Sequence, residues 1–494
     1  MRECKEYGLA PIMMPADCRC SRLRSGTMIE FHPGKNVDRS VHTHAVRMLL
    51  SLYLGEASAL LILIGIYKAP VYDWTLLSTK AGAALIAGAI GLMASGWLLA
   101  RQCAASGLWR RRALILGLTT NLLTLLLAFL LMESTVRILV RRTPAGVVVG
   151  SVTVRPTWSE LTAKSREVLA GVAPWGTWDS SYFVYDRELG WTVGPNRRSP
   201  DGLYYSSVEG IRSAGPNERM ADQTPRYRVA LIGDSNAFSF EVPFEDSWGY
   251  HLQRALGADV QVLNFGVDGY GIDQTYLRFQ RDVRPWKPRV VLIGFAGHDL
   301  SRSMAVYPFV SLGWPGYLVK PRFALDNGGL KLLNVPLPSP DEVLGAGRID
   351  QLPFARYDPG DRSAVDWWFD RGPLLVRFLT SVSPRWPGED PRMTEEAIKA
   401  LNGRLFVQLA RSIEESGAVA LLVHMSPRNS LVSDTLARAG VPFLEATDCL
   451  AEVPVDRRRV ASGHHYTGLA NLAIARCTAP AVALGLGKTG IARP

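Results

Sequence analysis

The sequence predicts an α/β domain that follows three membrane-spanning helices. Three stretches of about 20 apolar residues lie in the first third of the chain, and its later part alternates short apolar runs with amphipathic segments. Runs of four to six apolar residues between helical segments are typical of parallel strands buried on both faces. With 494 residues the chain is long enough for about three units of ordinary domain size.

The composition narrows the class of protein. Hydrophobic residues make up 47% of the chain and charged residues 20%, which excludes a wholly disordered protein and suggests membrane segments. The net charge of +10 would fit a nucleic-acid partner, but none is expected because many arginines flank the apolar stretches. Six scattered cysteines fit neither a disulfide scaffold nor a zinc ribbon, so a structural metal site is not expected. No cofactor is expected either.

The apolar stretches cover residues 48–67, 81–100 and 113–132. About 20 helical residues cross a hydrocarbon core of about 30 Å, so each stretch is long enough to span a bilayer. The second and third carry no charge. The first contains Glu56, which would cost about 3 kcal/mol at the bilayer centre, so a buried soluble helix is the alternative there.

The arginines between these stretches predict an orientation. Four arginines and no acid separate the second stretch from the third, so this loop is expected in the cytoplasm. The N-terminal tail, residues 1–47, is then cytoplasmic, and everything after about residue 140 lies outside. Arginines just after the third stretch argue the other way, although a long domain crosses largely regardless of them. We therefore expect a multi-pass protein of the cytoplasmic membrane whose C-terminal domain is extracytoplasmic, in the periplasm or at the cell surface.

The α/β domain is expected over residues 223–485, after a linker and lead-in over 141–222 that has weak periodicity. Thr394 is a good N-cap for one of its helices, and Gly417 would end that helix. The predicted strands are 228–232, 260–263, 290–295, 419–424 and 441–444, and the other predicted helices are 248–256, 274–282 and 469–475.

An insertion over residues 300–393 separates the third predicted strand from the fourth. Long connections often carry function, so this one is expected to line or cover a site. Its tryptophans suggest surfaces on which sugar rings stack, and packing inside the insertion is the alternative. The tryptophans considered for this role are Trp314, Trp367 and Trp368.

Four positions follow the predicted strands or open the last helix. They are Ser235, Gly269, His298 and His465. Ligands of open α/β sheets bind beyond the carboxyl ends of the strands, so these positions are expected at one edge of the sheet. A serine beside a histidine is a pairing for nucleophilic catalysis. The structural alternatives are a helix cap for Ser235, a hydrogen-bonded loop residue for His298 and helix-start packing for His465.

In these blocks the chain resembles the SGNH or GDSL hydrolase superfamily, over roughly residues 200–300 and 395–480. Gly-Asp-Ser at 233–235 is similar to the family's first block, and VLNFGVDGYG at 262–271 is similar to its second. The lead-in resembles that of membrane-anchored bacterial relatives. The resemblance implies a flavodoxin-like, three-layer α/β/α domain in which Ser235 is the nucleophile and His465 is the base.

The resemblance also implies an oxyanion hole formed by the backbone N–H groups of Ser235 and Gly269 and by the side chain at position 298. The family usually has asparagine there, and the imidazole N–H of His298 can still donate. The family's acid precedes the histidine, where this chain has Ser462, so the charged third member is expected to be missing and Ser462 is the candidate that orients His465. Further candidates, if their loop folds back, are Asp448, Glu452 and Asp456.

Other polar residues near these blocks have expected structural roles. Asp234 and Asp299 are expected to hold loop backbone rather than to take part in chemistry. Cys449 and Cys477 are the pair in the exported domain, for which a disulfide and buried free thiols are alternatives.

These inferences predict a membrane-anchored serine esterase acting on small acyl esters, with envelope carbohydrate as the substrate class implied by resemblance and location. One alternative is an O-acyltransferase that moves acyl groups onto polysaccharide. Another is a catalytically inactive module that binds glycan or a membrane biosynthetic partner. The expected partners are the lipid bilayer and an acylated carbohydrate or small ester.

Overall fold

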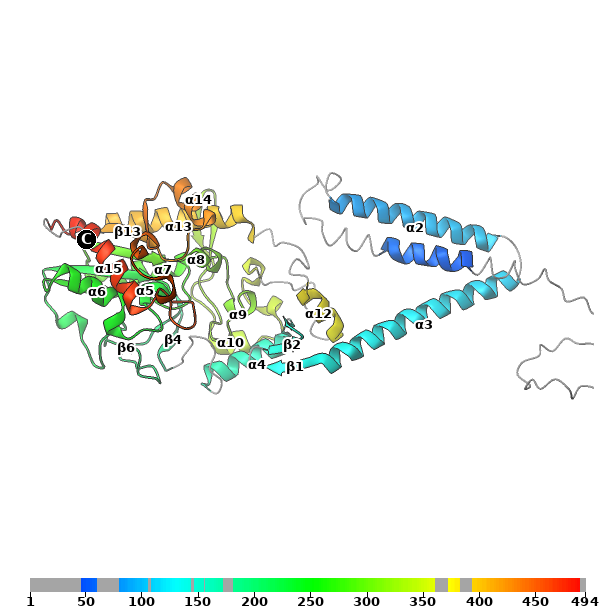
Figure 1. The fold of residues 1–494 in the computed structure, drawn as a ribbon, viewed down its shortest axis with the longest axis horizontal. Coiled ribbons are helices and arrows are strands. Elements are labelled where there is room, and N and C mark those ends of the chain that lie inside the picture. Colours follow the sequence, from blue (N-terminus) through cyan, green and yellow to red (C-terminus); the bar gives the residue numbers. More distant parts are fainter. Residues whose placement is uncertain are drawn as a thin grey trace, which may run out of the picture. The chain divides into compact units, whose positions relative to one another are not determined.

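The computed structural model describes residues 46–59, 80–104, 108–143, 146–154, 156–171, 181–359, 372–382 and 393–488. The chain divides into two compact units. Within the described residues, the first unit contains the helical segment 46–59 and residues 88–122. The second contains residues 80–87 and 123–488, with the α/β domain. Figure 1 follows the elements along the chain.

The second and third predicted spans lie in two long helices, α2 (Lys80–Ala104) and α3 (Leu108–Leu139). The first predicted span begins in the helical segment 46–59, and its remainder lies outside the described residues. In the first unit the Asn121 side-chain amide donates to the Glu56 carboxylate, which gives this acid a polar partner in a neighbouring helix.

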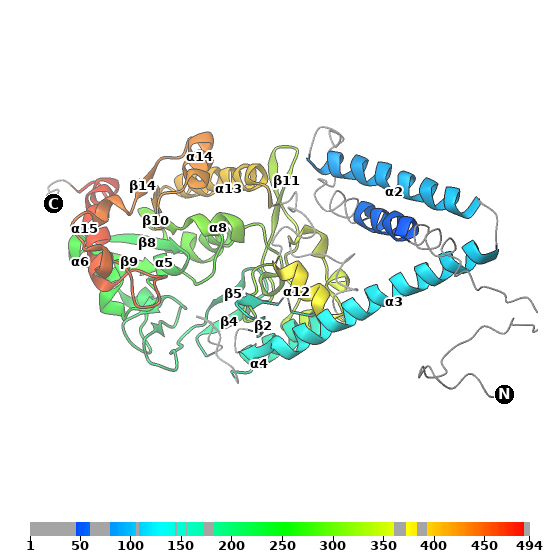
Figure 2. The same ribbon diagram turned by 45° about the vertical axis from the view of Figure 1, so that its right-hand side comes forward.

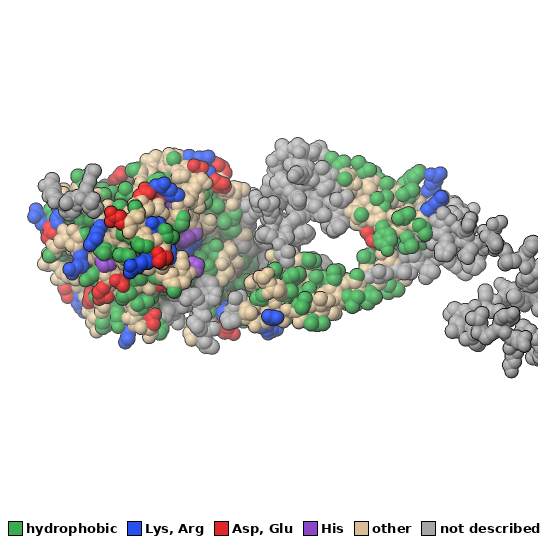
Figure 3. All heavy atoms as spheres, viewed as in Figure 1, with side chains coloured by type: hydrophobic (Ala, Val, Ile, Leu, Met, Phe, Trp, Pro, Cys, Tyr) green, Lys and Arg blue, Asp and Glu red, His purple; other side chains and the backbone are tan. Residues whose placement is uncertain are grey.

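Two described helices are long and apolar enough to cross a membrane, Asn121–Leu139 in α3 and Gly468–Gly485, which is α15. In α15, 44% of the residues are buried, and this helix belongs to the α/β domain. Leucines along α3 are exposed, and Figure 3 shows them as a mainly hydrophobic surface. Three spans are therefore not confirmed, and the crossing of a membrane by three helices stays a prediction.

The α/β domain is built on a sheet of five parallel strands, which confirms the predicted fold class. Its strands are β8 (Tyr227–Gly233), β9 (Val260–Asn264), β10 (Val290–Phe295), β13 (Val419–His424) and β14 (Phe443–Glu445). The order across the sheet is β9-β8-β10-β13-β14. Numbered along the chain this is 2-1-3-4-5, the flavodoxin-like order.

Alternate residues of each central strand enter two different cores. On β8, Ala230 and Ile232 pack into one core, while Val229 and Leu231 pack into the other. The first core is covered by α7 (Ile272–Arg278), α13 (Glu395–Glu415) and α14 (Ser430–Ala439), and the second by α6 (Trp248–Leu256) and α15. Figure 2 shows α13 and α14 beside the strands. Strands buried on both faces explain the continuous apolar runs in the sequence.

Most predicted elements of the sheet lie within two residues of their observed bounds. The strand predicted at 441–444 begins later, at Phe443, and Pro442 before it has no N–H for a ladder hydrogen bond. Thr394 caps α13, because its side chain accepts a hydrogen bond from the backbone N–H of Ala397.

The lead-in and the insertion both contain ordered elements. In the lead-in they are β1 (Val140–Thr143), β2 (Gly146–Val149), β3 (Val152–Thr153), α4 (Trp158–Leu169), β4 (Phe183–Asp186), β5 (Gly190–Val193), β6 (Tyr205–Ser206) and β7 (Arg212–Ser213). In the insertion they are α9 (Pro308–Ser311), β11 (Phe323–Asp326), β12 (Gly329–Leu332), α10 (Pro340–Gly345) and α12 (Leu374–Val382). Trp367 and Trp368 lie outside the described residues.

Candidate active site

The candidate nucleophile lies on a tight turn between a strand and a helix. β8 ends at Gly233, and the one-turn helix α5 (Ser235–Phe238) begins immediately afterwards. Gly233 has a φ of +136°, and a Cβ there would lie 1.8 Å from the carbonyl oxygen of Gly294, so only glycine fits this turn. The Asp234 carboxylate caps α5 by accepting from the backbone N–H of Asn236 at 2.9 Å.

Three side chains form a continuous hydrogen-bonded line at this turn. His465 Nε2 lies 2.9 Å from Ser235 Oγ. His465 Nδ1 lies 2.5 Å from Glu241 Oε2. Ser235 and His465 are both buried, at 3% and 8% exposure. Serine, histidine and carboxylate in this order, with distances of this size, are the arrangement of a serine hydrolase.

The expectation that the site lacks a charged third member is wrong, because Glu241 supplies it. The acid comes from the loop after α5 instead of the segment before the histidine. Ser239 and Glu241 both have positive φ, 61° and 64°, so this loop turns back sharply enough to bring the carboxylate under the ring. Sequence reasoning missed Glu241 because its contact with His465 joins residues 224 positions apart. The available signal was an acid within the mostly apolar segment FSFEV, residues 238–242, shortly after the nucleophile.

Arg212 and Tyr204 hold the loop that carries Glu241. The buried Arg212 guanidinium donates to the carbonyl oxygens of Ser239 and Val242, both at 2.6 Å, and to that of Phe238. The backbone N–H of Glu241 donates to the Tyr204 hydroxyl at 2.7 Å. These contacts give the strained loop fixed partners, so the lead-in, which supplies both side chains, positions the acid.

Ser462 contacts the acid rather than the ring. Its hydroxyl donates to Glu241 Oε2 at 2.7 Å, so it orients the carboxylate that in turn orients His465. Burial would raise the pKa of Glu241, but hydrogen bonds from His465 and Ser462 outweigh it and lower this pKa below its ordinary value. The lowered pKa favours the negatively charged form of Glu241, which is the form that the His465 ring needs beside it. Of the further candidates for the acid, Asp448 pairs with Arg428 instead.

A cavity of about 320 Å³ opens beside Ser235 and brings the four predicted positions together. Gly269 lies in its wall with a φ of +76°, and a Cβ there would contact Trp191, Trp314 and Tyr317 at 3.4–3.6 Å. The full lining is Ser235, Asn236, Asp268, Gly269, His298, Arg302, Trp314, Tyr317, His464 and His465. Trp314 and Tyr317 belong to the insertion, which therefore lines the site.

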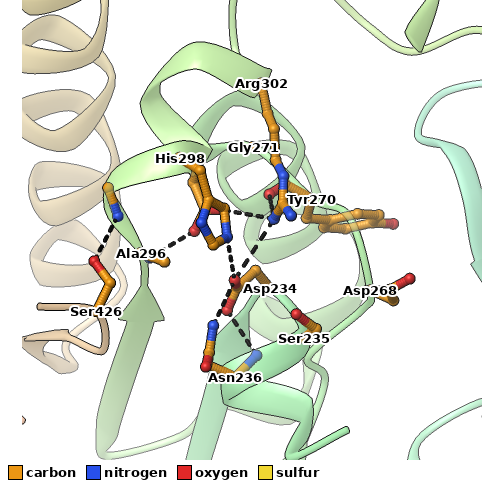
Figure 4. Close-up of polar contacts among 12 residues, drawn as sticks. Asp234, Ser235, Asn236, Asp268, Tyr270, Gly271, Ala296, His298, Arg302 and Ser426 are labelled. Atoms are coloured by element: carbon orange, nitrogen blue, oxygen red, sulfur yellow. Dashed lines mark hydrogen bonds and ion pairs between the residues drawn. The ribbon is translucent and has the colours of Figure 1, made fainter. Parts of the chain in front are cut away.

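His298 and Arg302 approach the carboxylate of Asp234 from the helix α8 (Gly297–Arg302), as Figure 4 shows. His298 Nε2 lies 3.4 Å from Asp234 Oδ2 and 3.4 Å from Asp299 Oδ1. Arg302 Nη1 lies 2.7 Å from Asp299 Oδ1 and 3.6 Å from Asp234 Oδ2. The His298 side chain is 52% exposed and lines the cavity, and its Nε2 lies between two buried acids.

The pKa values of the two buried carboxyls, Asp234 and Asp299, are shifted in opposite directions. Burial would raise the pKa of Asp234, but the neighbouring His298 and Arg302 lower it below the usual range. Burial and the negative charge of Asp234 raise the pKa of Asp299 to about 7. Asp234, His298 and Asp299 could together ligate a metal ion by composition, but the Arg302 guanidinium already supplies the positive charge there. These three residues therefore do not need a metal ion to balance their negative charge.

Cys449 and Cys477 form a disulfide, with their Cα atoms 5.5 Å apart. The bond joins the 3₁₀ turn Asp448–Leu450 to α15. Of the two alternatives for this pair, the structure has the disulfide.

No protein-family model matches this chain, and no curated protein matches it. Several solved structures are similar to it. The acetylxylan esterase Axe2 from Geobacillus stearothermophilus is 10% identical with a TM-score of 0.28, over 53% of this chain and 95% of that one. The carbohydrate acetylesterase Est24 from Sinorhizobium meliloti is 11% identical with a TM-score of 0.27, over 52% and 99%. TesA is 14% identical with a TM-score of 0.29, over 52% and 99%. Likenesses at this level assign no function.

Proposed function

We propose that the α/β domain is a serine esterase of the SGNH or GDSL type. The observation that carries this proposal is the line Ser235, His465 and Glu241, which opens into a cavity beside the strand ends. An inactive binding module was an alternative because of two departures, the histidine at position 298 and the missing acid near Ser462. The contact of Glu241 with His465 speaks against the second of these reasons.

The geometry supports acyl transfer through a covalent intermediate. Ser235 Oγ attacks the ester carbonyl carbon while His465 Nε2 takes the hydroxyl proton, and Glu241 stabilises the imidazolium that forms. The oxyanion is stabilised by the backbone N–H groups of Ser235 and Gly269 and by the His298 ring. His465 then protonates the leaving alcohol. A water molecule repeats the sequence on the acyl-enzyme and releases the carboxylic acid.

The substrate we propose is a small acyl ester on carbohydrate. A cavity of about 320 Å³ is at the lower end of the range for small-molecule sites, which suits a short acyl group. Trp314 and Tyr317 give its wall aromatic surface against which a sugar ring can pack. The same Ser235 and His465 chemistry would transfer the acyl group to a sugar hydroxyl instead of water.

We further propose that the domain is anchored in the cytoplasmic membrane and acts on its outer side, at the cell envelope. The exposed leucines of α3 and the orientation expected from the loop arginines support the anchor. The Cys449–Cys477 disulfide supports export, since disulfides persist in oxidising compartments.

The direct test is labelling of the full chain with a fluorophosphonate, together with turnover of an activated acetyl ester. We expect Ser235 to be labelled and Ser235→Ala to abolish both signals. Ser433→Ala, the same change at an exposed serine on α14, serves as the control. Assays with and without an oligosaccharide acceptor separate hydrolysis from transfer. The esterase proposal would be refuted if the wild type were not labelled and turned over no ester.

A further inference from the structure

A second line of serine, histidine and carboxylate lies at the same end of the sheet. His424 Nδ1 lies 2.8 Å from Glu445 Oε2, and His424 Nε2 lies 2.8 Å from Ser426 Oγ. His424 is the last residue of β13 and Glu445 the last of β14, and they are direct partners in the parallel register. The pairing of the two strands therefore places the acid beside the ring.

The hydrogen bonds of this line have one consistent direction. The ionised Glu445 carboxylate can only accept, so Nδ1 of His424 donates to it. In the tautomer with its proton on Nδ1, Nε2 accepts from the Ser426 hydroxyl. Ser426 Oγ in turn accepts from the backbone N–H of Gly297 at 3.0 Å. Figure 4 shows Ser426 beside the first turn of α8, with the bond to this nitrogen drawn. The His424 ring is fully buried and stacks on Phe295 at 5.4 Å, so it has little freedom to turn.

This contact replaces the ordinary cap of α8. The N-cap residue of α8 is Ala296, whose side chain has no oxygen to accept an N–H from the first turn. Ser426 accepts the N–H of Gly297 from outside the helix. A Cβ at Gly297 would lie 3.3–3.6 Å from Asn429, Val432 and Ser426, so the two segments are closely packed there.

The same segment also reaches the loop of the candidate base. The Tyr466 hydroxyl donates to the carbonyl oxygen of Met425 at 2.6 Å, and Tyr466 directly follows His465. Residues 424–426 are thus bonded on one side to the helix that carries His298 and on the other to the loop that carries His465.

We propose that Glu445, His424 and Ser426 form a relay of positioning residues that holds α8, and with it His298, in place beside Ser235. The proposal rests on the esterase function proposed above. Ser426 is not the nucleophile of a second site, because it does not line the cavity beside Ser235 and its oxygen is bonded to Gly297 within a closely packed contact. If His298 is an oxyanion donor, the relay acts mainly in the transition state, because a hydrogen bond to the ester carbonyl oxygen strengthens as that oxygen becomes negatively charged.

The test is a double-mutant cycle on the full chain. Ser426→Ala should lower kcat for an activated acetyl ester about 10- to 100-fold and leave KM within about twofold, because a shift of about 1 Å in a positioned group costs up to 100-fold. In a His298→Ala background the same change should have little further effect, since both act on one donor. Ser426→Thr, which keeps the hydroxyl, should restore activity, and Ser433→Ala should match the wild type.

A measurement independent of activity is hydrogen–deuterium exchange. In Ser426→Ala the backbone of residues 296–302 should exchange faster, while residues 260–264 of β9 should be unchanged. If the wild type has no esterase activity, this exchange alone decides whether the relay holds α8.

Three outcomes would overturn the relay: unchanged exchange, unchanged kcat in an active enzyme, or additive effects of Ser426→Ala and His298→Ala. Fluorophosphonate labelling of Ser426 in the Ser235→Ala protein would also overturn it and make Ser426 a nucleophile.

Discussion

Glu241 and Ser462 together orient His465, a role for which Ser462 was the first candidate in the sequence. The carboxylate contacts His465 Nδ1, and the Ser462 hydroxyl contacts the carboxylate. An acid is required here because the imidazolium formed during attack needs a negative charge at Nδ1. Because Glu241 supplies the acid, the loss of about four orders of magnitude in turnover that follows its neutralisation in a serine protease is not expected here.

Glu241→Gln should lower kcat by about three to four orders of magnitude, because the amide carries no charge and can present an N–H to the ring, which favours the wrong tautomer. Ser462→Ala removes one hydrogen bond to a carboxylate that stays charged, so its loss should be within about tenfold. Steady-state turnover of an activated acetyl ester measures both. Glu245→Gln, at an exposed position of the same loop, is the control. Activity of Glu241→Gln within tenfold of the wild type would mean that the ring needs no acid.

Asp299 should make stability depend on pH. Its pKa is raised from the usual 3.8 to about 7 by burial and by Asp234. Between these values the folded protein holds a proton that the unfolded chain releases, so stability should fall as pH rises from about 4 to about 7. Asp234, with a lowered pKa, contributes the opposite slope only below its usual range.

Replacing Asp299 with asparagine should flatten this slope, since the amide does not titrate. The midpoint of thermal unfolding, measured at several pH values, reports it, and Asp341→Asn at an exposed position is the control. An equal slope in wild type and Asp299→Asn would show that Asp299 is charged throughout this range.

At the scale of the elements, the turn after β8 and the loop after α5 bring the chemistry together, while the helices around the sheet supply stability. The Cys449–Cys477 disulfide contributes to stability and not to the chemistry, because its residues lie in a different part of the domain from the Ser235 cavity. It closes a loop across 28 positions between the 3₁₀ turn and α15.

Replacing both cysteines with serine should lower the free energy of unfolding by about 3 kcal/mol, because the unfolded chain loses its cross-link. We expect kcat to be unchanged below the unfolding transition. Chemical denaturation of the variant beside the wild type measures the difference, and reduced wild type should resemble the variant. A matching loss of kcat at low temperature would show that the disulfide also shapes the site.

At the scale of the whole molecule, the proposed membrane anchor predicts the side of the membrane on which the α/β domain lies. The arginines between the second and third apolar stretches predict that this loop is cytoplasmic and that the domain is outside. Alkaline phosphatase fused after residue 220 should be active, and a fusion between residues 101 and 112 should be inactive. The reverse pattern would return the domain to the cytoplasm and remove the envelope substrate from the proposal.

The sequence by itself determined the α/β class and most strand and helix positions. Strands buried on both faces leave continuous apolar runs such as 290–295, and these runs are local signals. It also placed Ser235, Gly269, His298 and His465 at the ends of strands or the start of a helix, from which the rule for parallel sheets predicts a shared edge. The structure lines one cavity with all four.

Only the tertiary structure decided which polar groups pair across that edge. Glu241 meets His465, Arg212 meets the carbonyl oxygens of the Glu241 loop, and Glu445 meets His424. Each of these contacts joins residues from separate elements, so no periodicity or local spacing records it. The positive φ of Glu241 and the register between β13 and β14 set two of them, and both arise from the packing of the whole domain.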